Sequence, residues 1–489
     1  MRPLLSSALT TLVLGCALQN TLATLLSIDT FGAVQNDASA NVTNMQAFQR
    51  ALDASRPGDT VLVPEGTYQL VGGVRGTGLI NVTVQIDGTL EYLHDLDHWP
   101  IPDDSTDGKY ANLLEFQDSS FVTVMSSTGA GLIDGGGKPW WNQYLIDGHD
   151  LRPKGLYFDR CSDVLVEGIT ILNSPSWHLR IAVVRAEISN FHVLVDRSYQ
   201  HTLKHQMQLR RLRDAGRGDD AQALAEAGPT YRGPTIPGRP HMILQPEDLN
   251  TDGIDVSGAD IWIHDCTIIN DDDSIAVKPS STGGSIGDTS FNCTQDMLVE
   301  NMVLTGFGAS IGSVGPSVAR PCVDRVTLRN ITMPQSGKGI YVKSNTSPCT
   351  GGVSSQLSNI LFEDVLMTRT VWWAVWIGPQ QQHQPHDALG GACALAYPLF
   401  DLPCPTQGCS DFRNITLRNV AAVDSLLSPG VLRGNVSNPM ELVFDNVTAS
   451  MSNGGPLRAW PFDGYDSSFV DGVCVNGCDP VPAGFVVQG

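Results

Sequence analysis

Three aspartates, Asp252, Asp272 and Asp273, have the residue types and spacing best suited to chemistry in this sequence. A carboxyl group that keeps its proton can donate it to a leaving oxygen, and an ionised neighbour can activate water, which together hydrolyse a glycosidic bond. Clustered carboxylates raise one another's pKa, so one of the three can stay protonated near neutrality. The cluster therefore predicts acid–base chemistry, with a solvated Asp-Gly turn and a calcium site as the alternatives.

An irregular repeat must position these acids. Alternating apolar residues surround one small polar residue in each copy, and period-two alternation marks strands with one buried face. The polar centres lie 36, 29, 34, 55 and 27 residues apart and are Asp265, Asn301, Asn330, Asp364, Asn419 and Asn446. Repeats of this size without crossover helices predict an all-β fold, a right-handed parallel β-helix in a single domain, rather than an antiparallel sandwich.

Stacked coils would bring the acids onto one surface. Asp252 and Asp272 are 20 residues apart, close to one coil, and the next two coils carry the glycine-rich residues 305–313 and then Lys343. Carboxylates, glycines and a cation would thus line the floor of one groove. A cation two coils from the acids favours acid–base work over a solvated loop.

Two further segments have expected roles. Residues 45–56 are predicted to form a short amphipathic helix that plugs the N-terminal end of the β-helix core. Residues 197–241 depart from the strand pattern, are helix-prone and carry 8 of the 30 Lys and Arg residues. We interpret them as a surface excursion or a translated intron, with a basic arm that grips an acidic polymer as the alternative.

Charge and hydropathy limit the classes of binding partner that this chain can have. The formal net charge of −21 disfavours nucleic acid, which needs a basic footprint. Beyond residue 30 no apolar run approaches the ~20 residues that span a membrane. An acidic polymer would need a locally basic groove on this chain, and a monomer is the default expectation.

Residues 1–23 are predicted to be a signal peptide, leaving 24–489 as a secreted, extracellular protein. Without Cys16 ten cysteines remain, an even number that fits disulfides; the close pairs Cys404/Cys409 and Cys474/Cys478 are candidate local bridges. Eight Asn-x-Ser/Thr sequons are also present, and we expect about half to carry glycans.

Over nearly all of residues 24–489, except 197–241, the chain resembles the pectin-degrading glycoside hydrolases of family 28. The most specific match is Asn250-Thr251-Asp252 followed by Asp272-Asp273. Supporting matches are FGAV at 31–34, DTVLVPEG at 59–66, GLIDG at 131–135 and NSPSWH at 173–178.

The resemblance implies an inverting hydrolase of pectic polysaccharide that uses no metal or other cofactor. It matches Asp272 to the general acid, Asp252 and Asp273 to the residues that hold and deprotonate water, and Asn250 to a substrate contact. It also matches Lys343 to a lysine that meets a uronate carboxylate.

Three positions depart from the family pattern. Phe307 stands in place of the histidine of Gly-His-Gly, Tyr341 in place of the arginine of Arg-Ile-Lys, and Ser274 in place of a cysteine. Phe307 and Tyr341 are retained as candidate substrate-binding residues, but the imidazole and guanidinium are lost. The preferred polymer is therefore left open between polygalacturonate, rhamnogalacturonan and xylogalacturonan. A calcium-dependent lyase and a catalytically weakened wall-binding homologue are the other hypotheses.

Overall fold

The structure is a computed structural model, which describes residues 23–488 apart from several gaps. These gaps are 104, 106, 148–149, 197–208, 210–211, 214–215, 228–249, 281–292, 316–319, 346–353, 382–392, 394–403, 427, 435–437, 439, 453–472 and 476–485. The predicted signal peptide and the pair Cys474/Cys478 lie outside the described side chains.

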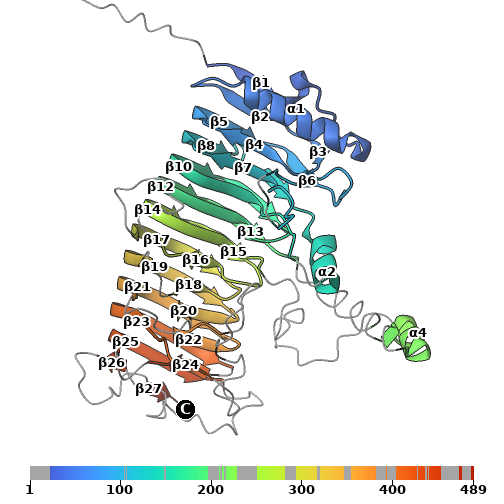
Figure 1. Ribbon diagram of the computed structural model, residues 1–489. Coiled ribbons are helices and arrows are strands. Elements are labelled where there is room, and N and C mark those ends of the chain that lie inside the picture. The colour runs from blue at the N-terminus through green and yellow to red at the C-terminus, as the bar shows by residue number, and fades with distance from the viewer. Residues whose placement is uncertain are drawn as a thin grey trace, which may run out of the picture.

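The strands stack into one long parallel β-helix, as Figure 1 shows from the blue N-terminal coils to the red C-terminal ones. Each coil contributes strands to three faces, and the fold expected from the repeats is confirmed. The face that carries the candidate site, here called the site face, uses the first halves of three long strands together with shorter ones. Its strands are β4 (Val74–Thr77), β7 (Leu114–Gln117), β10 (Leu156–Glu167), β12 (Leu179–Ser189), β14 (Ile254–His264), β16 (Ile275–Val277), β18 (Ala309–Val314), β20 (Lys338–Ser344), β22 (Trp373–Pro379) and β24 (Ser428–Leu432).

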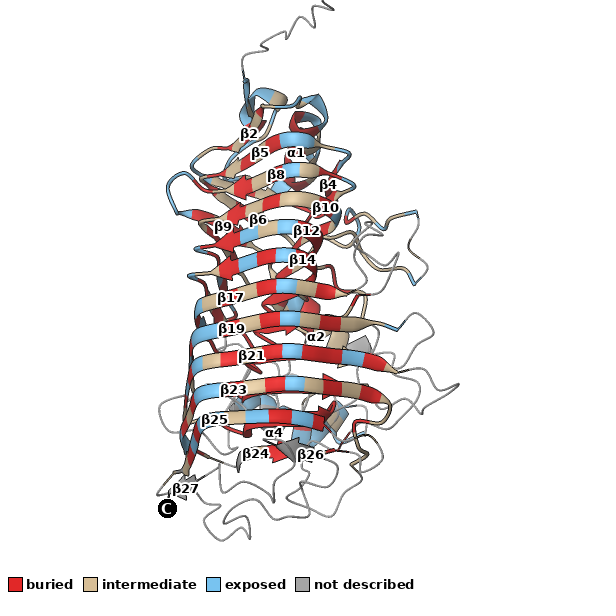
Figure 2. Ribbon diagram, turned by 90° about the vertical axis from the view of Figure 1, so that its left-hand side faces the viewer, coloured by how far each residue is buried: buried red, intermediate tan, exposed pale blue. Residues whose placement is uncertain are grey.

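The other two faces continue the same coils. The second face contains the later halves of β10, β12 and β14 and the earlier parts of five long strands, together with shorter ones. Its strands are β1 (Leu25–Ser27), β2 (Thr60–Val63), β5 (Ile80–Ile86), β8 (Ser120–Met125), β17 (Thr294–Leu304), β19 (Cys322–Pro334), β21 (Ser355–Thr368), β23 (Ser410–Ser425), β25 (Met440–Met451) and β26 (Val473–Val475). The third contains β3 (Thr67–Leu70), β6 (Thr89–Tyr92), β9 (Gly131–Asp134), β11 (Ile169–Leu172), β13 (His192–Leu194) and β15 (Thr267–Ile269), then the final residues of β17, β19, β21, β23 and β25, and β27 (Val486–Gln488). Alternating bands of buried and exposed residues run along the long strands of Figure 2, as period-two patterning requires.

The polar centres of the repeat form a hydrogen-bonded ladder at the bend between faces. Asn301 Nδ2 donates to Asp265 Oδ1 (3.1 Å) and Asn330 Nδ2 donates to Asn301 Oδ1 (2.7 Å). The same contact joins the later pair of centres, Asn446 Nδ2 to Asn419 Oδ1 (3.0 Å). These residues have φ near +55°, a left-handed conformation that Asn and Asp tolerate best. The spacing of these polar centres in the sequence is therefore irregular because single coils differ in length.

Helix α1 (Asn41–Ala54) packs across the first coil and buries Phe48 and Leu52 in the main core. It lies beside β1 and β2 at the N-terminal end of the stack in Figure 1. The predicted plug is thus present, although the helix begins at Asn41 rather than at residue 45. Two short 3-10 turns, η1 (Ile28–Phe31) and η2 (Ala38–Ala40), lead into it.

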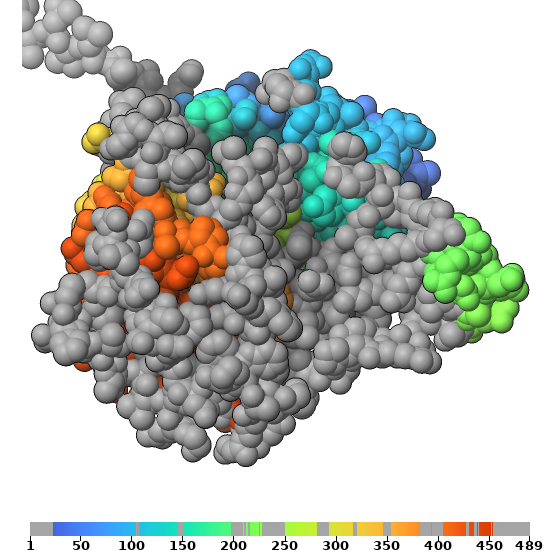
Figure 3. All heavy atoms as spheres, turned by 60° about the horizontal axis from the view of Figure 1, so that its bottom comes forward, coloured from blue at the N-terminus to red at the C-terminus, as the bar shows by residue number. Residues whose placement is uncertain are grey.

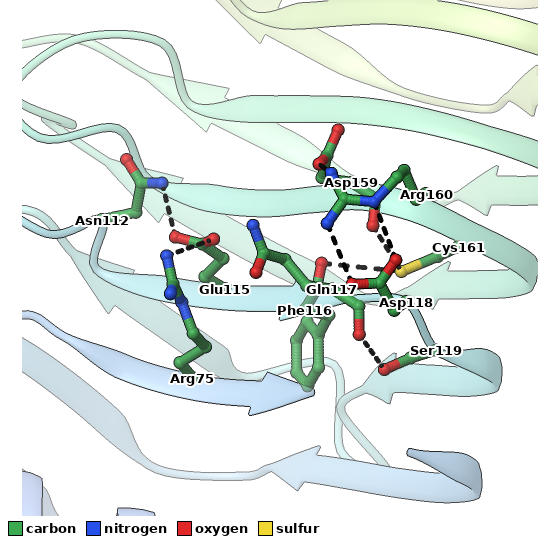
Figure 4. A network of polar contacts seen from close by, with 10 residues as sticks. All are labelled: Arg75, Asn112, Glu115, Phe116, Gln117, Asp118, Ser119, Asp159, Arg160 and Cys161. Carbon is green, nitrogen blue, oxygen red and sulfur yellow. Dashed lines mark hydrogen bonds and ion pairs between the residues drawn. The ribbon is translucent and has the colours of Figure 1, made fainter. Parts of the chain in front are cut away.

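Outward-facing side chains pair from coil to coil, and Figure 4 shows two such groups. Arg75 Nη2 lies 2.9 Å from Glu115 Oε1, whose other oxygen accepts from Asn112. At the bend, Arg160 forms a two-pronged contact with Asp118 (2.7 and 2.9 Å). Bidentate arginine–carboxylate pairs of this kind fix register between neighbouring coils.

The cysteines divide into bridged and free ones. Cys293–Cys322 and Cys393–Cys404 are disulfides, while Cys161 and Cys266 are buried thiols. The Cys404/Cys409 bridge expected from sequence proximity is wrong. Cys393 is anchored by its N–H to Gln380 O (2.9 Å), which brings it rather than Cys409 to Cys404.

The region 197–241 contributes helix α4 (Gly218–Ala227), consistent with its helix-prone composition. In Figure 3 this green helix lies at the rim of the molecule, apart from the orange C-terminal coils. Helix α2 (Gly137–Asp147) flanks the stack. Among the described helices, none is both long and apolar enough to cross a membrane.

Candidate active site

One row of residues on the site face contains the acids. Six strand residues on this face pair with one another from coil to coil: Leu156, Leu179, Ile254, Ile275, Ala309 and Ile340. The residue two positions before each of them belongs to the row. We call this row the site ladder. Its members, in coil order, are Lys154, Trp177, Asp252, Asp273, Phe307 and Lys338. Two acids thus stand at the centre, with an aromatic residue and then a lysine on either side.

The three aspartates meet as the sequence predicted. One carboxylate oxygen from each of Asp252, Asp272 and Asp273 lies within 4.8 Å of the others, and all three side chains are buried. Asp252 aligns with Asp273 rather than with Asp272, because this coil is one residue longer than their 20-residue separation. Asp272 therefore stands one residue before the aligned pair of Asp252 and Asp273.

Backbone contacts fix the acidic turns. The Asn270 amide donates to Thr251 O (2.9 Å), Asp272 O (3.0 Å) and Asp273 O (3.0 Å), which ties the two acidic turns together. Ser274, which stands where the family has a cysteine, lies 2.8 Å from Asn270 Oδ1 and is fully buried. A hydroxyl hydrogen bond thus occupies the position of the missing disulfide.

The glycines of residues 305–313 allow the next coil to approach the acids. Gly306 has φ +46°, and a Cβ there would lie 2.2 Å from Asp272 O. Gly308 has φ +66°, and a Cβ there would lie 2.1 Å from Gly339 O. Only glycine fits both the left-handed conformation and the close backbone contact. Glycine is therefore required at Gly306 and Gly308, within the glycine-rich residues that were predicted to line the groove floor, by the packing around the acids.

Asp272 is built to hold a proton. Burial, and then the neighbouring charge of Asp273, raise the pKa of Asp272 above its ordinary value. Its oxygens accept backbone hydrogen bonds from Asn250 N and Asp273 N, both at 2.8 Å, which limit that rise and fix the direction of the carboxyl group. A carboxylic acid in this state suits a general acid.

Asp273 has the opposite character. Burial acts to raise the pKa of Asp273, but the positive charges of Lys343 and Lys278 outweigh it and hold the pKa below its usual range. Lys343 Nζ lies 2.6 Å from Asp273 Oδ2, and both side chains are buried. Asp273 is therefore ionised when Asp272 is protonated.

Asp252 completes the site. Burial, followed by the charges of Asp255 and Asp272, raises the pKa of Asp252 well above its ordinary value. Within the described residues, Asp252 Oδ1 and Asp273 Oδ1 are buried and have no hydrogen-bond partner. Two buried oxygens without a donor, on aligned members of neighbouring coils, create a place for a water molecule between them.

Arg152, Asn250 and His178 lie next to the acid cluster and are fixed by hydrogen bonds. Arg152 binds Asp150 through Nε (2.7 Å) and reaches Asn250 Oδ1 through Nη2 (3.2 Å), so the side chain of Asn250 is oriented. His178 is buried; Ser174 N donates to its Nε2, which leaves Nδ1–H to donate to Asp252 O (2.9 Å). Burial lowers the pKa of His178 to about 4, so this imidazole is a neutral support.

Phe307 and Tyr341, predicted as substrate contacts, enclose a cation. Lys338 Nζ lies 4.0 Å from the Tyr341 ring centre, 4.6 Å from that of Phe307 and 5.7 Å from that of Trp372. Tyr341 Oη accepts a hydrogen bond from Gln381 N (2.8 Å), and both predicted residues are at most 3% exposed. Substrate binding by Phe307 or Tyr341 stays a prediction, whereas their packing around Lys338 is a finding. Sequence reasoning missed Lys338.

The Lys338 side chain is 1% exposed, and its Nζ has no hydrogen-bond acceptor among the described residues. Burial, and then the like charge of Lys343, lower the pKa of Lys338 to about 7. The unfolded chain keeps this proton up to the ordinary lysine pKa. The folded state is therefore destabilised most below pH about 7, and the cost fades as pH rises above that value.

Lys338→Met is accordingly expected to stabilise the protein at acidic pH, with the gain shrinking as the pH rises toward the ordinary lysine pKa. Urea unfolding on either side of neutrality measures this difference, with Lys338→Arg as the variant that keeps the charge. Equal losses of stability for Lys338→Met at both pH values would contradict a charge-dependent cost and indicate lost packing alone.

Further cations lie beside the acids and on the two coils before them. Lys278 Nζ lies 3.1 Å from Asp255 Oδ1. Lys154 Nζ lies 4.3 Å from the centre of the Trp177 ring, and Arg180 binds Ser257 Oγ (3.1 Å). The locally basic surface that an acidic polymer would need is therefore present beside the acids, despite the net charge of −21.

The acid cluster fits a divalent cation poorly. Asp273 Oδ2 already accepts from Lys343, and both oxygens of Asp272 accept backbone N–H groups. Calcium takes about six to eight oxygen ligands. At most three oxygens, both of Asp252 and Oδ1 of Asp273, are left as ligands, which is well short of that number, and the ammonium groups of Lys343 and Lys278 already supply positive charge.

A search against protein-family models matches "Glycosyl hydrolases family 28" over residues 55–200 and 240–386. The match includes all three aspartates and Lys343, and it leaves out residues 201–239 within the atypical segment. The chain belongs to glycosyl hydrolase family 28. The resemblance drawn from the motifs is thereby confirmed.

Two named pectinases are similar to the chain at modest identity. A probable endo-xylogalacturonan hydrolase A of Aspergillus flavus is 26% identical over 332 residues, which span 67% of this chain and 66% of that protein. A probable exopolygalacturonase A of Aspergillus niger is 26% identical over 317 residues, covering 63% and 60%. The matched region is thus just under two thirds of each relative.

Solved structures agree on the fold. The endo-xylogalacturonan hydrolase of Aspergillus tubingensis superposes with a TM-score of 0.54 at 19% identity, covering 93% of this chain and 92% of that one. A polygalacturonase of Erwinia carotovora ssp. carotovora gives 0.57 at 16% identity, covering 87% and 92%. At these identities the likeness shows the shared β-helix and no more.

Proposed function

We propose that this family 28 protein hydrolyses α-glycosidic bonds in galacturonate-containing pectic polysaccharide, with inversion and without a metal. The observation that carries the proposal is the division of labour among the three buried acids. The pKa values of Asp252 and Asp272 are raised and that of Asp273 is lowered. Only Asp272 has both oxygens held by backbone N–H groups, whereas Asp252 and Asp273 each offer a buried oxygen without a partner among the described residues to one water molecule.

In this mechanism Asp272 donates its proton to the glycosidic oxygen as the bond to the anomeric carbon breaks. Asp273 takes a proton from the attacking water, and Asp252 holds that water in line. Lys343 keeps Asp273 ionised and presents positive charge to a uronate carboxylate, while Asn250 contacts the sugar. Each proton thus moves between a stated donor and acceptor, and the acids return to their starting state when Asp273 passes its proton to solvent and Asp272 regains one.

The preferred polymer is the finer part of the proposal. Relatives named for xylogalacturonan and for polygalacturonate share the matched region at the same identity, so both polymers are candidates, and rhamnogalacturonan is a third. Incubating the purified protein with these three polymers and measuring reducing ends tests the activity. We expect release from at least one of them, and release from none would overturn the hydrolase proposal in favour of a wall-binding homologue.

Removal of divalent cations is expected to leave the activity unchanged, because ammonium groups rather than oxygen ligands surround the acids. The measurement is the rate of reducing-end release in a chelator, with and without added calcium. A loss in the chelator that calcium restores would contradict the proposed chemistry and favour a calcium-dependent lyase.

Disulfides and homology to pectinases favour a secreted protein, and we propose an extracellular monomer. The predicted leader and glycans belong to this proposal. Mass spectrometry of the mature protein before and after deglycosylation would identify the N-terminus and the modified asparagines together.

A further inference from the structure

The site ladder has an accessible cation at one end only. On the C-terminal side, Lys338 is sealed behind three aromatic rings, with its Nζ buried. On the N-terminal side, Lys154 and Trp177 are each partly exposed. A ligand that lies along the site face can therefore reach the Lys154 ammonium but not the Lys338 ammonium.

Backbone contacts place Lys154 in line with the acids. Gly155 N donates to Trp177 O (2.8 Å), and His178 N donates to Asp252 O (2.9 Å), so these residues belong to consecutive coils. Neighbouring strands lie about 4.8 Å apart, which puts the Lys154 backbone about 10 Å before that of Asp252. A polymer positioned over the acids and running along the coils would extend over Lys154.

The Lys154 ammonium is held but not neutralised. Its Nζ lies 4.3 Å from the Trp177 ring centre and 5.1 Å from that of Tyr157, and none of the described carboxylates forms an ion pair with it. Lys278 Nζ lies 5.8 Å from the same Trp177 ring but is paired with Asp255. The aromatic faces thus fix Lys154 by cation–π contact, and it has no counter-ion within the part of the chain that the structure describes.

We propose that Lys154, held on Trp177 and flanked by Arg180, is a subsite for the carboxylate of a uronic acid residue two coils away from the bond that is cleaved. The inference rests on the proposed function and deepens it. It assigns this end of the site to an acidic sugar rather than to a neutral side branch.

The charges around Lys154 agree with an anionic ligand. Burial, and then the positive charge of Arg180, lower the pKa of Lys154 to about 8, while Asp255 and Glu115 act in the other direction and Lys109 adds to the lowering. Lys154 is therefore charged at acidic and neutral pH. A bound carboxylate would offset the repulsion from Arg180, and its binding should weaken as pH rises above about 8.

The test measures binding by calorimetry in the Asp272→Asn background, with a length series of de-esterified oligogalacturonates and their methyl-esterified counterparts. Adding Lys154→Met should weaken binding of the acidic oligomers about tenfold once they are long enough to reach it, since a lost charge-assisted contact is of that size. Binding of the neutral esters should not change. Lys154→Arg should retain the acidic preference, and Arg329→Gln, on β19 beside Glu300, is the charge-matched control.

Equal binding of acidic oligomers with and without Lys154→Met would overturn the subsite. A parallel loss for acidic and neutral oligomers would also overturn it, because a structural defect would affect both. Failure of the proposed function gives a different result, since wild-type protein would then release no reducing ends from any pectic polymer, whatever Lys154→Met binds.

Discussion

Asp272→Asn is expected to lower the rate of reducing-end release by roughly 10²–10⁴-fold, the usual contribution of a positioned general acid. An amide retains the shape of the carboxyl group, and its single oxygen can still accept one of the two backbone N–H groups, that of Asn250 or that of Asp273. It cannot deliver a proton to the leaving oxygen. Loss of activity without loss of the fold is therefore the expected result.

Two controls accompany this variant. Asp424→Asn, at an exposed left-handed position that Asn tolerates well, should keep full activity. The Asp272→Asn protein should unfold at a temperature close to that of wild type, because the loss of a buried group that repels Asp273 offsets the one N–H that loses its acceptor. Retention of wild-type rates by Asp272→Asn would show that another group donates the proton.

Lys343→Met is expected to destabilise the protein by about 3–5 kcal/mol, the range for breaking a buried ion pair from one side. Asp273 would lose the ammonium 2.6 Å from its Oδ2 and be left as an uncompensated buried charge. Its pKa should then rise, so the acid limb of the pH–rate profile should move to higher pH. Urea unfolding and the pH–rate profile measure the two effects.

The matched control for Lys343 is Arg413→Met, which breaks the exposed pair with Glu441 and should cost no more than about 1 kcal/mol. The double variant Lys343→Met/Asp273→Asn should regain much of the lost stability but not the activity. An equally unstable double variant would mean that Lys343 acts through packing rather than through its charge.

The fold could be predicted from sequence because its signal is repeated many times. The same alternation of apolar residues around a polar centre recurs from coil to coil. In the structure, polar centres between Asp265 and Asn446 are hydrogen-bonded to those of the neighbouring coil. The three aspartates could be found for the same reason, since a separation close to one coil places residues on adjacent strands. Once the fold is a stack, spacing translates into proximity.

The cations around the acids carried no such signal. Lys338, Lys278 and Lys154 stand apart in sequence, and only the true register of each coil shows that they flank the acids. From sequence, Phe307 and Tyr341 could be compared only with the histidine and arginine that the family has at these positions. Their positions in the structure show that both rings also pack against Lys338. Disulfide pairing could not be predicted either, because Cys404 pairs with Cys393, 11 residues away, rather than with Cys409, which is nearer in sequence.

The anomeric configuration of the first product, followed by proton NMR during hydrolysis, tests the central claim most directly. One water held between Asp252 and Asp273, with Asp272 as the acid, predicts a single displacement and an inverted product. The close spacing of the carboxylates resembles that of retaining enzymes, so the outcome is not given by distance alone. Initial release of the retained anomer, or of an unsaturated sugar, would contradict the account.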